Sequence, residues 1–275
     1  MIEKNQFALW AKSGHALFEI FEGRNDAYPL SKRWMTEWLD SGDFLVSSSD
    51  VQLLSDLLID FEYQAFRIHQ ATARRMDEQV RRMLAGNLTA RKISNVGVAF
   101  FPFLFTWNLQ RYKQYFLQGG DLDLVSHFEK LGLALEAEQS RLKEFASLHI
   151  LIDEIDNDRI GEIWRIVNQT LRKLGIGQNE PVGTAKVLHM VAPNYFPLWD
   201  NSIAEAAGLK SRGTTLTLAD YIHWMNRLRK WLLAFAPECR KLEVETQLSL
   251  LKLVDEGLYV MSSISLDRRV KLLGI

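Results

Sequence analysis

Three side chains that can act as acids, bases or nucleophiles lie close together in the segment 182–203. Lys186 and His189 are three residues apart, so on a helix they share one face. Asp200 follows a proline-containing turn and stands where the N-cap of the next helix belongs. We therefore take Lys186, His189 and Asp200 as candidate catalytic residues.

The same segment has a purely structural interpretation. A carboxylate at an N-cap accepts backbone N–H bonds and faces the positive end of the helix dipole, so Asp200 can serve as a cap alone. His189 is then a satisfied histidine of the core or its rim. Phe196, Pro197 and Trp199 are buried residues that fix the turn. Both interpretations stay open from the sequence.

The stretch AKVLHMVAPNYFPLWDNSI resembles part of the helix-hairpin-helix DNA glycosylase superfamily, over about residues 182–203. In that family an Ala- and Val-rich helix, a loop with proline and an aspartate opening the next helix occur at nearly this spacing. The resemblance implies that Asp200 stabilises the sugar cation that forms as the base leaves, or activates a water. It also implies an all-α fold of two subdomains flanking a cleft, into which the target base is flipped.

The resemblance further places Gly183 and Thr184 near a hairpin whose backbone N–H groups bind a DNA phosphate. Gly183 falls near the position at which lyase-competent members carry a lysine nucleophile, and Lys186 could take that role only with a shifted geometry. The implied partner is DNA. The implied activity, if the chain is active, is that of a DNA N-glycosylase-like hydrolase.

A second candidate DNA-binding surface lies on a long helix predicted from about residue 50 to 85, which Ser49 or Asp50 can cap. A solvated helix face is the favoured explanation of its charges. The acidic excess over residues 127–158 would neutralise them if the two helices pack side by side. The basic residues proposed to contact DNA are Arg74, Arg75, Arg81 and Arg82.

The hydrophobic spacing is helical almost throughout and strand-like alternation is nearly absent, which predicts an all-α protein. Long amphipathic patterns joined by short turns predict a long-helix bundle with antiparallel hairpins over residues 1–155. The pattern then resets, and residues 156–275 are predicted to form a compact region of shorter helices, glycosylase-like by the resemblance.

Local signals set several expected helix ends. One apolar stripe predicts a continuous helix over 124–152, and another predicts a helix over 242–260. Thr217 can cap a helix that Pro237 closes.

Composition limits the classes of function. The chain has 275 residues, of which 47% are hydrophobic and 24% charged, as in a folded protein with a sizeable core. Its 33 basic and 34 acidic residues nearly cancel, so DNA binding needs a local patch. Cys239 is the only cysteine, which excludes an internal disulfide. The longest apolar run, Val96–Trp107, is too short to span a bilayer. We expect a cytoplasmic protein without membrane contact.

No phosphate-binding glycine loop and no HExxH motif occurs, and the six histidines are spread singly along the chain. The sequence therefore predicts no metal site and no cofactor. The alternative to a DNA-associated function is a non-enzymatic protein that docks a protein partner, or forms a homodimer, through its long helical hairpin or its tryptophan-rich N-terminus. That alternative predicts a large exposed apolar patch or a dimer.

Overall fold

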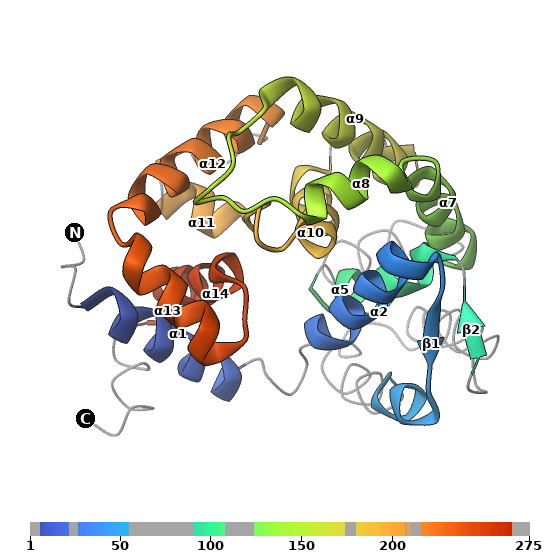
Figure 1. The fold of residues 1–275 in the computed structure, drawn as a ribbon, viewed down its shortest axis with the longest axis horizontal. Coiled ribbons are helices and arrows are strands. Elements are labelled where there is room, and N and C mark those ends of the chain that lie inside the picture. The colour runs from blue at the N-terminus through green and yellow to red at the C-terminus, as the bar shows by residue number, and fades with distance from the viewer. Residues whose placement is uncertain are drawn as a thin grey trace. The chain divides into compact units, whose positions relative to one another are not determined.

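The computed structural model describes residues 6–21, 27–54, 91–93, 95–107, 124–173, 180–206, 208–209 and 216–265. The described chain is all-α, as predicted, with one short pair of strands (Figure 1). Most of the predicted basic helix, including the four arginines proposed to contact DNA, lies outside the described residues. No described helix combines the length and the apolar character needed to cross a bilayer.

The helices are easily followed in chain order. Their bounds are α1 Phe7–Phe21, α2 Tyr28–Ser41, α5 Val96–Trp107, α7 Leu124–Glu136, α8 Gln139–Ala146, α9 Asn157–Lys173, α10 Pro181–Val191, α11 Asn201–Ala206, α12 Leu218–Leu233, α13 Ala236–Thr246 and α14 Leu250–Ser263.

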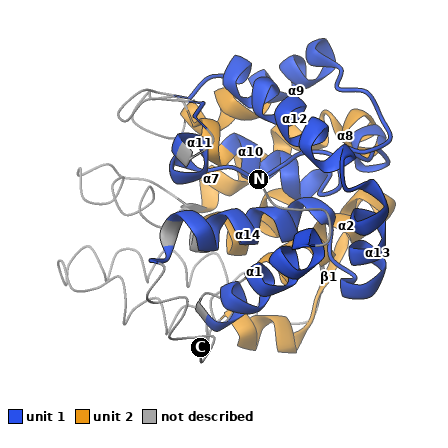
Figure 2. Cartoon of the chain, turned by 90° about the vertical axis from the view of Figure 1, so that its left-hand side faces the viewer, with its two compact units in different colours: residues 1–24, 144–165, 184–275 blue, residues 25–143, 166–183 orange. Residues whose placement is uncertain are grey.

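The chain divides into two compact units (Figure 2). Unit 1 comprises residues 1–24, 144–165 and 184–275, and unit 2 comprises residues 25–143 and 166–183. Both units thus combine segments that are distant in the sequence. The single boundary expected near residue 155 stays a prediction.

In unit 1, α14 packs along α1. The crossing depends on glycine, because a Cβ atom on Gly14 would lie 2.6 Å from the Cα atom of Gly257. A Cβ atom on Gly257 would meet the ring of Trp10 at the same distance. The two helices therefore approach to backbone contact, and residues 250–257 of α14 are buried.

Two predicted helices are each broken in the structure. The segment 242–260 forms α13 and α14, because Gln247 takes a left-handed backbone with φ 58° and Ser249 caps α14 through a bond from the Lys252 N–H. The segment 124–152 forms α7 and α8, separated by a turn at residues 137–138. Such local breaks leave the apolar stripe intact, so periodicity alone misses them.

Helix starts give mixed results. The cap predicted at Thr217 is present at the start of α12, and Asp220 completes it as a capping box. Pro237 does not close α12, which ends at Leu233; it lies in the first turn of α13 instead, where a missing N–H is tolerated.

Unit 2 has a helical core in which α5 packs against α2 and α7. The approach of α5 to α7 is close, since a Cβ atom on Gly97 would overlap the carbonyl oxygen of Phe128. Strands β1, Phe44–Val46, and β2, Arg91–Ile93, pair antiparallel. Strands of three residues are too short to give a period-2 signal, which is why the sequence does not reveal them.

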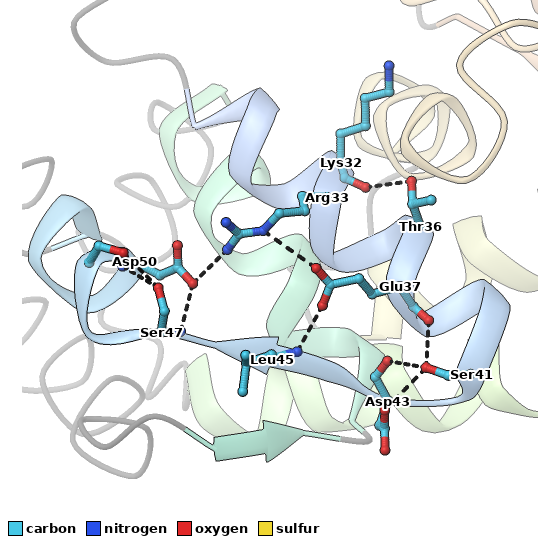
Figure 3. A network of polar contacts seen from close by, with 10 residues as sticks. Lys32, Arg33, Thr36, Glu37, Ser41, Asp43, Leu45, Ser47 and Asp50 are labelled. Atoms are coloured by element: carbon cyan, nitrogen blue, oxygen red, sulfur yellow. Dashed lines mark hydrogen bonds and ion pairs between the residues drawn. The ribbon is translucent and has the colours of Figure 1, made fainter.

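A polar network holds the end of α2 against β1 and the following helical turn (Figure 3). Asp50 is buried, and its carboxylate accepts bonds from Arg33 at 2.6 Å and from the Ser47 N–H at 2.7 Å. The Ser47 hydroxyl accepts the Asp50 N–H in return, so Ser47, rather than the predicted Ser49 or Asp50, is the cap. Burial opposes ionisation of Asp50, but the bonds from Arg33 and Ser47 outweigh it and lower the pKa of the carboxyl.

We expect Asp50→Asn to lower the free energy of unfolding at pH 7 by about 1–3 kcal/mol, because two donors lose a charged acceptor. The folded-state pKa lies below the unfolded value of about 3.9. The contribution of ionised Asp50 to the free energy of unfolding is therefore complete above the unfolded-state pKa and is lost as pH falls through the folded-state pKa. Urea denaturation from pH 7 to pH 2 measures it, with Asp43→Asn as the control. A difference from wild type that is constant over this range would contradict the expectation.

The helix crossing in unit 1 gives a second test. Gly14→Ala should lower the free energy of unfolding by about 1–3 kcal/mol, because its Cβ meets backbone that cannot move aside. The matched control is Gly161→Ala in α9, where the nearest atom lies at 3.5 Å. That substitution should raise the free energy of unfolding by about 0.5–1 kcal/mol. Equal stability of the two variants would show that α1 and α14 are not in backbone contact.

Candidate functional site

Lys186 lies on α10 and its side chain is almost fully enclosed in unit 1. The residue is 6% exposed. Burial lowers the pKa of its ammonium to about 8, although the negative charges of Asp200 and Asp255 act in the opposite direction. A lysine with this pKa carries a fraction of neutral amine at physiological pH, and neutral amine is the form that reacts as a nucleophile.

Asp200 is the N-cap of α11, as the sequence predicts. Its Oδ1 accepts the N–H of Ile203 at 2.7 Å, and its backbone carbonyl accepts the N–H of Ala204 at 3.0 Å. The residue is partly exposed, unlike Lys186 and His189. Among the three candidate catalytic residues, Asp200 is therefore the one with access to solvent.

His189 is fully buried and joins α10 to the turn that follows it. Its Nδ1 lies 2.7 Å from the carbonyl oxygen of Phe196, which assigns the proton to Nδ1 as donor. Pro193, predicted to mark the helix end, follows α10 after its last residue, Val191. The geometry gives His189 a clear role in shaping the path from α10 to α11.

Two further side chains fix the same turn. The Tyr221 hydroxyl donates to the carbonyl of Pro197 at 2.8 Å, and the Trp224 Nε1 donates to the carbonyl of Leu198 at 3.4 Å. Both donors come from α12. Three successive carbonyls of the turn, those of residues 196–198, thus accept hydrogen bonds from buried side chains. These bonds hold the backbone that leads to Asp200 in one conformation.

Asp255 is a member of the site that the sequence analysis missed. It lies on α14, is 6% exposed, and its Oδ2 finds no hydrogen-bond partner among the described residues. Burial raises the pKa of its carboxyl to about 7, with the charges of Lys252 and Lys186 opposing the rise and those of Asp200 and Glu256 adding to it. A signal for it exists: Asp255 occupies the apolar stripe of α14, where an acid is unexpected.

The ionisable groups of α10, α11 and α14 therefore act on one another within unit 1. The negative charges of Asp200 and Asp255 act to raise the pKa of Lys186. The charge of Asp200 acts to raise the pKa of Asp255, and that of Lys186 acts to lower it. We call Lys186, Asp200 and Asp255 the charged triad. Perturbed pKa values that arise from burial together with specific charged partners are typical of functional sites.

A pocket of about 760 Å³ lies in the same unit. Two residues that line the pocket follow the acids in the sequence by about one helical turn. Ile203 lies three residues after Asp200, and Leu258 lies three residues after Asp255. The volume is in the range of small-molecule pockets. Its described lining is apolar and aromatic with two cations: Ile203, Trp224, Arg227, Leu228, Lys230, Trp231, Leu258, Met261 and Ser262.

Gly183 and Thr184, the proposed phosphate-binding residues, both lie in the first turn of α10 and are buried. First-turn N–H groups are those that lack partners within a helix, so this position is compatible with anion binding. Their proposed contact with DNA stays a prediction.

Cys239 is buried on α13, and its Sγ donates to the carbonyl of Leu232 at 3.8 Å. Burial raises the pKa of the thiol to about 12. The thiolate is the reactive form, so this cysteine is a packing residue at physiological pH.

Comparison of the chain with protein-family models, curated proteins and solved structures finds no match. The functional assignment therefore depends on the charged triad and on the pocket in the same unit.

The raised pKa of Asp255 predicts how stability depends on pH. An acid with a folded-state pKa above its unfolded value destabilises the fold as pH rises between the two values, here from about 4 to about 7. Asp255→Asn removes this effect. Relative to wild type, the variant should gain stability across that range, reaching about 2–4 kcal/mol above pH 7.

The measurement is equilibrium urea denaturation of both proteins from pH 4 to pH 8. Asp153→Asn, an exchange at a partly exposed acid of the same unit, provides the control. A stability difference between Asp255→Asn and wild type that does not change with pH would show that Asp255 titrates normally.

Proposed function

We propose that unit 1 is a divergent helix-hairpin-helix glycosylase-like unit that acts on DNA as an N-glycosidic hydrolase. The observation that carries the proposal is that Lys186 is buried in the same unit in which Asp200 caps α11 from a partly exposed position. These are the lysine and the aspartate singled out from the sequence, and the charge of Asp200 acts on the lysine. The pocket supports it by providing an apolar and aromatic space in the same unit, with one lining residue, Ile203, in the first turn of the helix that Asp200 caps.

In this proposal Asp200 is the catalytic carboxylate. When the bond between C1′ of the deoxyribose and the base breaks, the base leaves with the electron pair and positive charge develops on the sugar. A fixed carboxylate stabilises that charge without having to reorganise, since its Oδ1 is already held by the Ile203 N–H. Water then adds to C1′ and loses a proton, which completes the hydrolysis.

In this proposal Lys186 supplies the amine of a lyase step on the resulting abasic sugar, which requires its enclosed side chain to become accessible when DNA binds. With a pKa of about 8, roughly one fifth of the amine is neutral at pH 7.4. Attack of that amine on C1′ of the ring-opened sugar, with loss of water, gives a Schiff base. Borohydride reduces such an imine to a stable adduct, so the step can be trapped.

The flanking residues have supporting roles. His189 holds the turn that leads to Asp200, and Trp224 and Trp231 line the space into which a flipped base would stack. Arg227 and Lys230 carry positive charge on α12 at the pocket, as suits the DNA backbone.

The test uses a labelled duplex with one abasic site, the matching intact duplex and the single strand, at two salt concentrations. We expect binding that weakens as salt rises, and a borohydride-trapped adduct with the abasic duplex. Lys186→Gln should abolish the adduct, while Lys241→Gln, at an exposed lysine of α13, should leave it unchanged. A further duplex that carries one damaged base measures base release. Asp200→Asn should slow this release by about 10²–10³-fold.

Binding of intact DNA that is lost when the charges of Arg74, Arg75, Arg81 and Arg82 are removed would assign the contact to the basic helix. Binding whose affinity does not change with salt, or no binding to any of the three probes at low salt, would overturn the DNA role. The docking of a protein partner, or a homodimer, would then be the remaining function, and light scattering would distinguish these two.

A further inference from the structure

A histidine and two glutamates meet where α1 crosses α14 in unit 1. His15 Nδ1 lies 2.8 Å from Glu256 Oε2, and one ligand atom from each of His15, Glu19 and Glu256 lies within 4.8 Å of the others. His15 and Glu19 are four residues apart on α1, so they share one face of that helix. We propose that these three side chains bind a divalent transition-metal ion of the zinc class.

The ligand chemistry suits such an ion. Imidazole nitrogen and carboxylate oxygen bind Zn²⁺ at about 2.0–2.2 Å in tetrahedral geometry, so two ligand atoms on one ion are about 3.4 Å apart. The 2.8 Å between His15 and Glu256 therefore has to widen by roughly half an ångström to admit the ion. Histidine and carboxylates without thiolate also suit Mn²⁺ and Fe²⁺, and Zn²⁺ binds more tightly than either in the general order of affinities.

The backbone around the cluster is fixed by close packing. Gly14 and Gly257, each next to a ligand in the sequence, are in backbone contact across the helix crossing. His15 and Glu256 are thus held at a set separation by the main chain itself. Ligands that are positioned in this way lose little conformational freedom on binding a metal.

Lys252 orients the buried ligand. Its Nζ lies 3.2 Å from Glu256 Oε1 and 4.4 Å from the ring centroid of Phe18. This ion pair engages one oxygen of Glu256 and leaves the other directed at His15. With neutral His15, the two glutamates and Lys252 sum to one negative charge, which favours a cation.

The cluster is open on one side. Glu256 is buried, whereas His15 is partly exposed and Glu19 is exposed. Three protein ligands with solvent access leave a coordination position for water, which is the arrangement of reactive rather than purely structural metal sites. This site involves none of the charged triad, so it can be present whether or not the chain acts on DNA.

The experiment titrates the metal-free full chain with Zn²⁺ by calorimetry, and with Co²⁺ followed by visible absorption. We expect one saturable site and a Co²⁺ spectrum that Zn²⁺ abolishes. Glu19→Gln is the main variant because Glu19 is exposed and its loss spares the core. It should weaken binding by at least about tenfold, as loss of a metal-supporting residue does. His15→Gln should weaken it as much or more.

Glu245→Gln is the matched control, at an exposed glutamate of α13 that pairs with Lys12 of α1, and it should bind as wild type does. Circular dichroism of each variant confirms that the fold is retained. Wild-type affinity in both Glu19→Gln and His15→Gln, or no saturable binding by the wild-type chain, would overturn the proposal. DNA binding and adduct formation do not enter this measurement, so its failure is distinct from failure of the glycosylase assignment.

Discussion

The turn between α10 and α11 depends on three buried donors that satisfy successive backbone carbonyls. His189 binds the first, Tyr221 the second and Trp224 the third. A buried carbonyl without a donor costs about as much as a lost hydrogen bond. The turn is therefore tied to α10 at one side and to α12 at the other. Asp200 follows directly, so its position relative to Lys186 is fixed by the same bonds.

The charges of α14 are the second constraint, and they oppose stability. Lys252 and Glu256 form a buried ion pair. Asp255 is their neighbour on α14, and its Oδ2 has no hydrogen-bond partner among the described residues. Removing two charges from water is expensive, and apolar residues of similar size often stabilise a fold better. The cost of these charges is compatible with the proposed role of α14 in a site as well as in the core.

The sequence predicts what is local. The all-α class, the cap at Asp200 and the cap at Thr217 each follow from spacing within a few residues. The break at Gln247 was missed because a left-handed glutamine is rare and its neighbours keep the helical pattern. The pocket could not be predicted, because α11, α12 and α14 line it only once they have folded together. The proximity of Asp255 to Lys186 and Asp200 likewise exists only in the folded chain, so the sequence does not reveal it.

The cap alone does not explain the choice of residue at position 200. Asparagine or serine caps a helix about as well as aspartate, and neither brings a negative charge toward Asp255. With aspartate, the two carboxylates repel each other, which contributes to the raised pKa of Asp255. Lys186 offsets part of that repulsion, but only by burying an ammonium whose own pKa falls to about 8. A purely structural cap would avoid each of these costs. The proposed use of the Asp200 charge in a site would account for the combination.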